Sequence, residues 1–394
     1  MSAASTVQRH HGIRQVRAAA QQRLPRPVFD FADGGAEDEV TLRRNEDAFR
    51  QWAFLPQPLE GATTRDQSVT LFGRHLSLPV LIGPTGLAGL FWPRGEIASA
   101  LAAAAAGTVY CLSHGSACSI EEVAGHHHGP RWMQVFVYRD RGFTRELTQR
   151  ARDAGFDALV LTIDNQLLGK RERDLANGFA IPPRFSGAQW LGMAAKWRWW
   201  LAMRRELPTL TFGNYVRPGS TESLATLAGR MGSLLDPGMR WEDVAQLRAE
   251  WQGPLLLKGV LHPADARRAV ALGIDGLIVS NHGGRQVDGA IATLDALPAV
   301  VAAVDGRVPV LIDGGIRRGA DVVKAIALGA HAVLVARPQL WGLALAGEAG
   351  VAHVLEVYRS EIDRVMGLLG AHDLAALRRL DLLVPCAGRR VDRP

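Results

Sequence analysis

The sequence predicts an α/β protein whose main unit is a (β/α)8 TIM barrel. Eight short apolar runs follow one another between residues 78 and 338, and eight is the strand number of such a barrel. Helical patterns separate the runs, and one short phrase that contains a glycine recurs at three junctions. We expect an N-terminal helical extension over 1–77 that packs on the barrel, and the barrel with its C-terminal helices over 78–394. A long insertion, 165–240, follows the fourth run.

The apolar runs are the expected strands. Each is almost continuously apolar, which is typical of parallel strands that are buried on both faces. They are Leu78–Ile82, Thr108–Leu112, Met133–Val137, Ala158–Ile163, Leu255–Lys258, Gly276–Val279, Val308–Ile312 and Ala332–Val335.

Helical patterns follow most of these runs, namely Arg94–Ala106, Thr144–Ala154, Trp241–Trp251, Pro263–Leu272, Leu294–Val304 and Gly319–Leu328. Three of them lead into related phrases, AGFDALV at 154–160, LGIDGLI at 272–278 and LGAHAVL at 328–334. The glycine in each phrase predicts a left-handed helix stop before the next strand.

Composition limits the function classes. A chain of 394 residues with 47% hydrophobic and 21% charged residues is ordinary for a globular protein. The net charge of +6 is dispersed and lacks a basic and aromatic module, which argues against nucleic acid as a partner. Three cysteines without a CxxC pair favour a reducing compartment. We expect a cytoplasmic protein, because neither a signal-peptide core nor a run of eighteen apolar residues is present.

Two segments outside the repeat have open interpretations. The stretch Trp190–Arg205 is dense in Trp, Lys, Arg and Met. It fits a surface helix packed on the barrel, or a substrate lid or membrane-surface segment that would hold the protein at the inner face of the membrane. The adjacent histidines 126–128 cannot all point one way and lack further ligands at metal-site spacing, so we expect no metal.

Polar residues stand where the expected strands end, and barrel active sites lie at the carboxyl ends of the strands. The loop 280–286, Ser-Asn-His-Gly-Gly-Arg-Gln, places His282 and Arg285 on one glycine-rich turn. An imidazole suits a general base, and a carboxylate such as Asp164 stabilises its cationic form. The guanidinium of Arg285 suits a substrate carboxylate.

The motifs after the last two strands predict a phosphorylated ligand, and a lysine at the end of the fifth strand adds a positive charge. The motif Asp313-Gly314-Gly315-Ile316-Arg317 and the pair Ala336-Arg337 follow strands seven and eight, where barrels often bind phosphate. Lys258, among apolar neighbours, is either a Schiff-base lysine or a fixed cation beside a ligand that acquires negative charge.

At these residues the sequence resembles the FMN-dependent 2-hydroxy-acid oxidoreductases, which include glycolate and lactate oxidases, flavocytochrome-type L-lactate dehydrogenases and mandelate dehydrogenase. The likeness starts at residues 24–39, recurs at 169–174 and is most specific in the loop 280–286. It implies an FMN cofactor, a 2-hydroxy acid as substrate, an electron acceptor that is a quinone or oxygen, and a homotetramer.

The resemblance also implies residue roles. His282 would be the base, supported by Asp164, and Arg171 and Arg285 would bind the substrate carboxylate. The implied cofactor contacts are Pro84, Thr85, Gly86, Ser113, Gln134, Thr162, Lys258, Ser280, Asp313, Gly315, Arg317, Ala336 and Arg337. The segment from Gly86 to Glu96 is more similar to mandelate dehydrogenase than to the oxidases, which favours slow reaction with oxygen.

Two positions depart from the family's pattern. Phe31 and Phe136 stand where the family usually has tyrosines whose hydroxyls touch the substrate. The change predicts a bulkier, more apolar (S)-2-hydroxy acid, such as a mandelate-like substrate. The alternatives are an oxygen-using oxidase, altered chemistry (amine oxidation or oxidative decarboxylation), a flavin-binding protein without turnover, and Schiff-base chemistry at Lys258.

Overall fold

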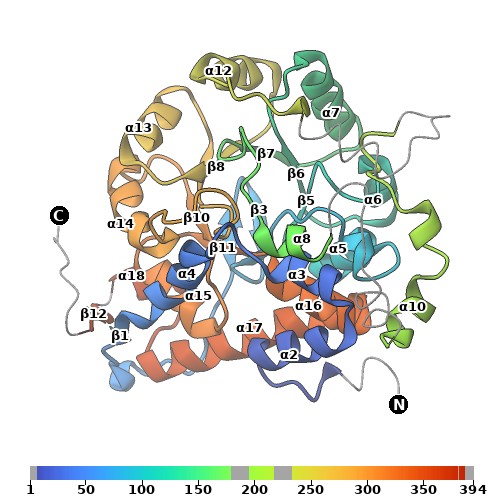
Figure 1. Cartoon of the computed structure of the whole chain (residues 1–394). Helices are drawn as coiled ribbons and strands as arrows, with labels where there is room; N and C mark the ends of the chain where they lie inside the picture. Colours follow the sequence, from blue (N-terminus) through green and yellow to red (C-terminus); the bar gives the residue numbers. More distant parts are fainter. Residues whose placement is uncertain (1–6, 179–194, 217–232, 380, 387–394) are drawn as a thin grey trace.

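Eight parallel strands close into a barrel at the centre of the molecule (Figure 1). The computed structural model describes residues 7–178, 195–216, 233–379 and 381–386. The strands follow one another around the barrel in chain order, and the last pairs with the first. They are β4 (Val80–Ile82), β5 (Tyr110–Leu112), β6 (Arg131–Val135), β7 (Ala158–Thr162), β8 (Leu255–Val260), β9 (Gly276–Val279), β10 (Val310–Asp313) and β11 (Ala332–Val335). The predicted fold class is confirmed, and the predicted strand bounds differ from the observed ones by no more than two residues.

Helices surround the barrel, and each of the six predicted helical patterns forms one. These are α5 (Gly95–Ala105), α7 (Arg141–Asp153), α12 (Trp241–Glu250), α13 (Pro263–Ala271), α14 (Thr293–Val304) and α15 (Gly319–Ala327). The sequence interpretation missed α6 (Ile120–His126) between β5 and β6. Ser119 and Glu122 form a capping box at its start, a pattern that is visible in the sequence.

The repeated glycines end their helices as predicted. Gly155, Gly273 and Gly329 have φ angles of 70°, 76° and 105°, a region that residues with a Cβ rarely enter. Each therefore turns the chain directly from a helix into the next strand.

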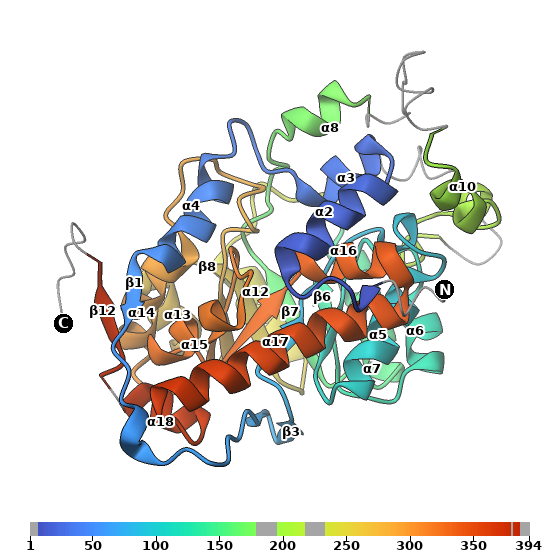
Figure 2. The same ribbon diagram turned by 90° about the horizontal axis from the view of Figure 1, so that it is seen from below.

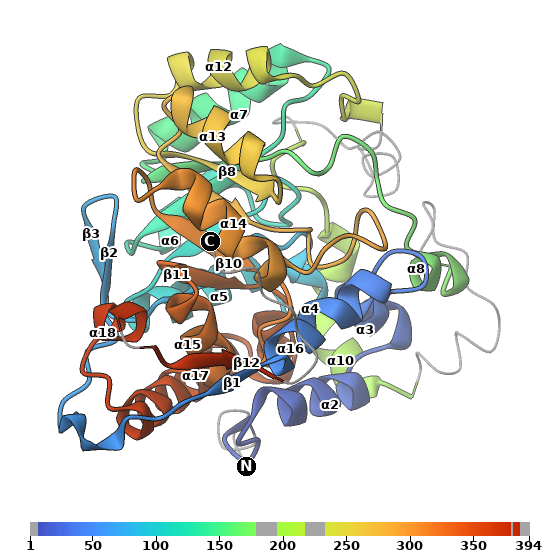
Figure 3. The same ribbon diagram turned by 90° about the vertical axis from the view of Figure 1, so that its left-hand side faces the viewer.

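A hairpin closes the barrel at the end opposite the polar strand ends. Leu71 of β2 (Val69–Leu71) and Leu76 of β3 (Arg74–Leu76) are buried with inward-facing strand residues such as Leu81 and Cys111. In Figure 3 this hairpin lies on the far side of the molecule from α8 (Glu172–Ala176). Because apolar side chains fill this end, a ligand can enter only at the other.

The two ends of the chain pack against each other beside the barrel. The first helix, α2 (Ile13–Arg23), lies along α16 (Arg337–Ala346), which packs on α17 (Glu348–Leu369), as Figure 2 shows. The other elements of these regions are α3 (Arg26–Asp33), α4 (Val40–Arg50), β1 (Trp52–Phe54), η1 (Pro58–Glu60), α18 (Leu374–Arg379) and β12 (Leu383–Pro385), which pairs with β1. This packing brings α3 and α4 over the polar end of the barrel.

The insertion carries short elements, α8, α10 (Trp197–Met203) and η3 (Leu207–Thr209). Trp199 Nε1 donates to Leu90 O at 3.0 Å, and Lys196 Nζ donates to Gln22 O at 2.6 Å. These bonds hold α10 on the body of the protein, as expected for the surface helix within 190–205; residues 190–194 lie outside the described part of the chain. No described helix is long and apolar enough to cross a membrane.

Candidate active site

A cavity of about 1080 Å³ opens at the carboxyl ends of the barrel strands. It gathers the sequence-predicted site residues from all eight strand ends, from α3 and from the insertion. Those that line it are Phe31, Pro84, Thr85, Gly86, Ser113, Gln134, Phe136, Thr162, Arg171, Lys258, His282, Arg285, Asp313, Gly315, Arg317, Ala336 and Arg337. Asp164 and Ser280 do not line it, but each bonds to a residue that does.

His282 stands at the cavity beside its predicted carboxylate. Its Nδ1 lies 2.9 Å from Oδ1 of Asp164, and its backbone has a φ of +58°, which costs energy in a residue with a Cβ. Burial opposes ionisation of Asp164, yet His282 and Lys258 lower the pKa of this carboxyl below its ordinary value. A carboxylate at Nδ1 favours the tautomer that leaves Nε2 free to accept a proton.

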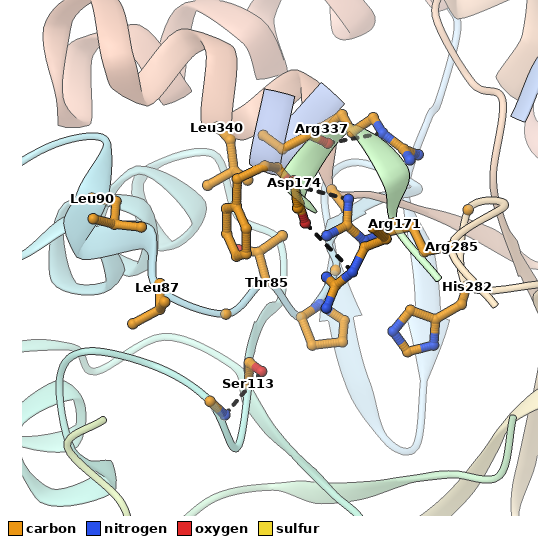
Figure 4. A pocket seen from close by; sticks show the side chains of 18 of the residues that line it. Thr85, Leu87, Leu90, Ser113, Arg171, Asp174, His282, Arg285, Arg337 and Leu340 are labelled. Atoms are coloured by element: carbon orange, nitrogen blue, oxygen red, sulfur yellow. Dashed lines mark hydrogen bonds and ion pairs between the residues drawn. The ribbon is translucent and has the colours of Figure 1, made fainter. Parts of the chain in front are cut away.

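Guanidinium groups concentrate positive charge next to His282. Figure 4 shows Arg171, Arg285 and His282 on one side of the pocket. Arg285 Nη1 donates to the carbonyls of Phe31 and Gly34, both at 2.9 Å, and its guanidinium lies 5.6 Å from the centre of the Phe31 ring. Burial, then Arg171 and Arg337, lower the pKa of Arg285. A carboxylate ligand would relieve this repulsion, so the arrangement favours an anion.

Lys258 is a fixed cation in the wall of the cavity. Its Nζ donates to Ser280 Oγ at 2.9 Å and lies 3.2 Å from Oδ2 of Asp313. Burial would lower the pKa of Lys258, but Asp313 and Asp164 outweigh it and raise the pKa. Schiff-base chemistry needs the neutral amine, so this environment favours the fixed-cation interpretation.

The part of the cavity that Gly314, Gly315, Arg317 and Arg337 line has the features of a phosphate site. Gly314 and Gly315 have φ angles of 92° and 79°, so the backbone after β10 turns where a Cβ would be strained. Arg317 and Arg337 lie here, and Arg337 opens helix α16. Burial, then Arg317, lower the pKa of Arg337 to about 10. Two crowded guanidiniums at a helix N-terminus suit a phosphate.

Three buried polar atoms around the cavity form no hydrogen bond within the described residues. Gln134 Nε2, Thr162 Oγ1 and Asp313 Oδ1 have no hydrogen-bond partner within the described part of the chain. Buried polar groups of this kind are rarely left unsatisfied in native proteins. An amide donor, a hydroxyl and a carboxylate match the ring heteroatoms and ribityl hydroxyls of FMN, so the residues present fit this cofactor.

The fold and the side chains at the cavity are those expected of one class, a barrel enzyme with sites for a phosphorylated cofactor and a carboxylic acid beside a histidine. Comparison with known families agrees, because the profile of the FMN-dependent dehydrogenases matches residues 20–383. The chain belongs to this family and is an FMN-dependent 2-hydroxy-acid dehydrogenase with FMN as its cofactor.

The chain is similar over almost its whole length to several described proteins. The L-lactate dehydrogenase of Caulobacter vibrioides is 42% identical over 379 residues, which is 94% of this chain and 98% of the relative. The structure of the monotopic membrane protein (S)-mandelate dehydrogenase has a TM-score of 0.91 and 41% identity and covers 95% of this chain and 99% of its own. A mandelate oxidase structure has a TM-score of 0.81 and 37% identity and covers 96% and 100%.

The two departures from the family pattern both face the cavity. Phe31 and Phe136 line it, and the ring of Phe136 contacts that of His114 in a tilted arrangement, with ring centroids 4.2 Å apart. His114 and Tyr215 also line the cavity, and sequence analysis selected neither. The position of His114 directly after Ser113, at a strand end, was the available signal.

Proposed function

We propose that the protein oxidises a bulky or aromatic (S)-2-hydroxy acid to the 2-oxo acid. The observation that carries this proposal is the set of apolar side chains in the lining of the cavity, which includes Leu87, Leu90, Trp200, Leu210 and Phe212. Figure 4 shows Leu87 and Leu90 across the pocket from the charged groups. Lactate has only a methyl group to place there, whereas a phenyl or long alkyl side chain would bury far more apolar surface.

The chain's own groups divide the work in this proposal. Arg171 and Arg285 bind the substrate carboxylate, and His282 accepts a proton from the substrate while Asp164 stabilises the resulting imidazolium. FMN, when bound, accepts the two electrons that the oxidation releases. Lys258 supplies a fixed positive charge to the cofactor. The remaining predicted contacts hold its ring, ribityl chain and phosphate.

The test is anaerobic mixing of the holoenzyme with a panel of 2-hydroxy acids. We expect mandelate and long-chain 2-hydroxy acids to bleach the flavin's visible absorption at lower concentration than lactate does. A His282→Ala variant should keep its cofactor but not bleach. A preference for lactate would refute the substrate class, and bleaching by 2-amino acids alone would favour amine oxidation.

We further propose that the electrons pass to a quinone rather than to oxygen. We also propose that helix α10 lies on the surface of the membrane that would hold this quinone. Trp197 and Leu201 of this helix are 61% and 54% exposed, next to Arg198. The related (S)-mandelate dehydrogenase is described as monotopic. Trp and Arg side chains on an amphipathic segment suit the interface of a bilayer.

Vesicle sedimentation tests the membrane contact. The holoenzyme should bind vesicles that contain anionic phospholipid, and the double change Trp197→Ser with Leu201→Ser should abolish binding. Leu368→Ser is the matched control, because Leu368 is 65% exposed on the distant helix α17. Equal loss with the control would refute a specific role of α10. Rapid peroxide formation under air would refute the preference for a quinone.

A further inference from the structure

Behind Phe136 lies a polar cluster, defined here as His114, Tyr138 and Tyr215. His114 Nδ1 lies 2.5 Å from the hydroxyl of Tyr215 and 2.8 Å from that of Tyr138, and the two hydroxyls are 2.7 Å apart. The three residues come from the loop after β5, the end of β6 and the insertion. His114 and Tyr138 are 8% and 1% exposed. The cluster is thus a closed triangle of polar atoms at the edge of the cavity.

The insertion fixes this arrangement. Asn214 Nδ2 donates to His114 O at 3.2 Å and to Ser116 Oγ at 2.9 Å, and Asn214 Oδ1 accepts from Ile120 N at 2.9 Å. Tyr215 is the next residue, so its ring is held against the loop that carries His114. This rigidity gives the triangle one geometry.

The histidine of the cluster is neutral. Burial, and to a smaller degree His282, lower the pKa of His114 to about 3. His114 and the proposed base His282 both line the cavity. A neutral imidazole carries one proton, on either Nδ1 or Nε2.

The triangle has one more N–H or O–H donor than it has acceptors for among its own members. With the proton on Nε2, both tyrosine hydroxyls donate inside the triangle and the Nε2–H has no acceptor there. With the proton on Nδ1, that nitrogen donates and cannot accept. One of the two tyrosine hydroxyls must then donate to an acceptor outside the triangle. Tyr138 does not line the cavity, whereas His114 and Tyr215 do. Either tautomer therefore leaves one N–H or O–H without an acceptor inside the cluster, and His114 and Tyr215 are the members that line the cavity and can donate into it.

We propose that His114, Tyr138 and Tyr215 present this single neutral donor to the 2-oxygen of the substrate. The inference rests on the proposed function, in which the carboxylate pairs with Arg171 and Arg285. Once the carboxylate is paired in this way, the oxygen on C2 is the remaining hydrogen-bond acceptor of a 2-hydroxy acid or a 2-oxo acid. A 2-ammonium group carries only donors, so the same cluster selects against amino acids.

A pair of ligands that differ in one oxygen tests the proposal. Phenylglyoxylate has the 2-oxygen and phenylacetate lacks it, and titration calorimetry of the holoenzyme measures the binding of each. His114→Phe and His114→Leu remove the ring N–H, and Tyr215→Phe removes the hydroxyl. In the holoenzyme, at least one of these changes should weaken phenylglyoxylate binding by about tenfold and leave phenylacetate unchanged, as expected for one lost hydrogen bond.

The controls separate this proposal from a packing effect and from the proposed function. Phe143 stacks on Tyr138 and Tyr215, at 5.1 and 5.2 Å, but does not line the cavity, so Phe143→Leu should affect both ligands equally. The cluster proposal is overturned if every variant weakens both ligands alike or changes neither. If mandelate fails to bleach even the unaltered holoenzyme, the proposed function fails instead.

Discussion

Replacement of Asp164 by asparagine should slow flavin reduction without removing the flavin. The change keeps the size of the side chain and an acceptor oxygen for His282 Nδ1, which now lies 2.9 Å from Oδ1. It removes the negative charge that stabilises the imidazolium formed when His282 takes the substrate's proton. The perturbation is therefore confined to the charge.

The magnitude follows from the kind of hydrogen bond that is lost. A bond to a charged group contributes about 1.5–3 kcal/mol and a neutral bond about 0.5–1.5 kcal/mol. The difference, about 1–1.5 kcal/mol, corresponds to a rate of reduction about 5- to 13-fold lower. Asp164→Ala should be slower still, because it leaves Nδ1–H without any acceptor.

Anaerobic rapid mixing with mandelate measures this rate. Asp33→Asn is the control, since Asp33 is also a carboxylate in an ion pair, 2.6 Å from Arg17 Nε, but its partners are Arg17 and Arg173 and not His282. We expect the control to reduce its flavin at the unaltered rate. If Asp164→Asn also reduced at that rate, the carboxylate would play no part in holding charge on His282.

Three further outcomes are expected. Gly259→Ala should slow reduction like Asp164→Asn, because Gly259 has a φ of +104° and a Cβ there would lie 2.9 Å from the Cβ of Asp164; an unchanged rate in rapid mixing would contradict this. Lys258→Met should lower the free energy of unfolding in urea by about 3–5 kcal/mol by leaving Asp313 without its cation, and adding Asp313→Asn should recover part of the loss. Burial raises the pKa of Asp33 but its arginine neighbours lower it further, below 3.8. Its contribution to stability is therefore present above that pH and lost as the pH falls through the folded-state pKa, so urea titrations should show that Asp33→Asn destabilises the protein at neutral pH and has little effect in acid.

The barrel could be predicted because its signals are local. Parallel strands buried on both faces leave continuous apolar runs such as Ala158–Thr162, and helix stops need glycines such as Gly155. The strand ends converge by the geometry of the closed barrel. His282, Lys258 and Asp313 therefore meet at the cavity even though the sequence separates them by up to 55 residues.

The insertion could not be predicted in the same way. Its 207–216 segment has no periodicity that places it on the barrel, and its position depends on single contacts such as Asn214 with His114 O. Likewise, a buried triangle from residues 114, 138 and 215 leaves no spacing pattern. Hydrogen bonds between side chains far apart in sequence become visible only when the chain is folded.

The absence of a hydroxyl at Phe136 is compatible with the hydrogen bonds of the polar cluster beside it. The centre of the Phe136 ring lies 4.2 Å from that of His114, with the two planes tilted by 59°, and 6.1 Å from that of Tyr138. An apolar ring at this position packs on the imidazole without competing for Nδ1, which already has two hydroxyl neighbours. A tyrosine there would add another donor beside a triangle that already holds one in excess. The phenylalanine therefore fits a site in which the proposed hydrogen-bond donor to the substrate belongs to the cluster behind it.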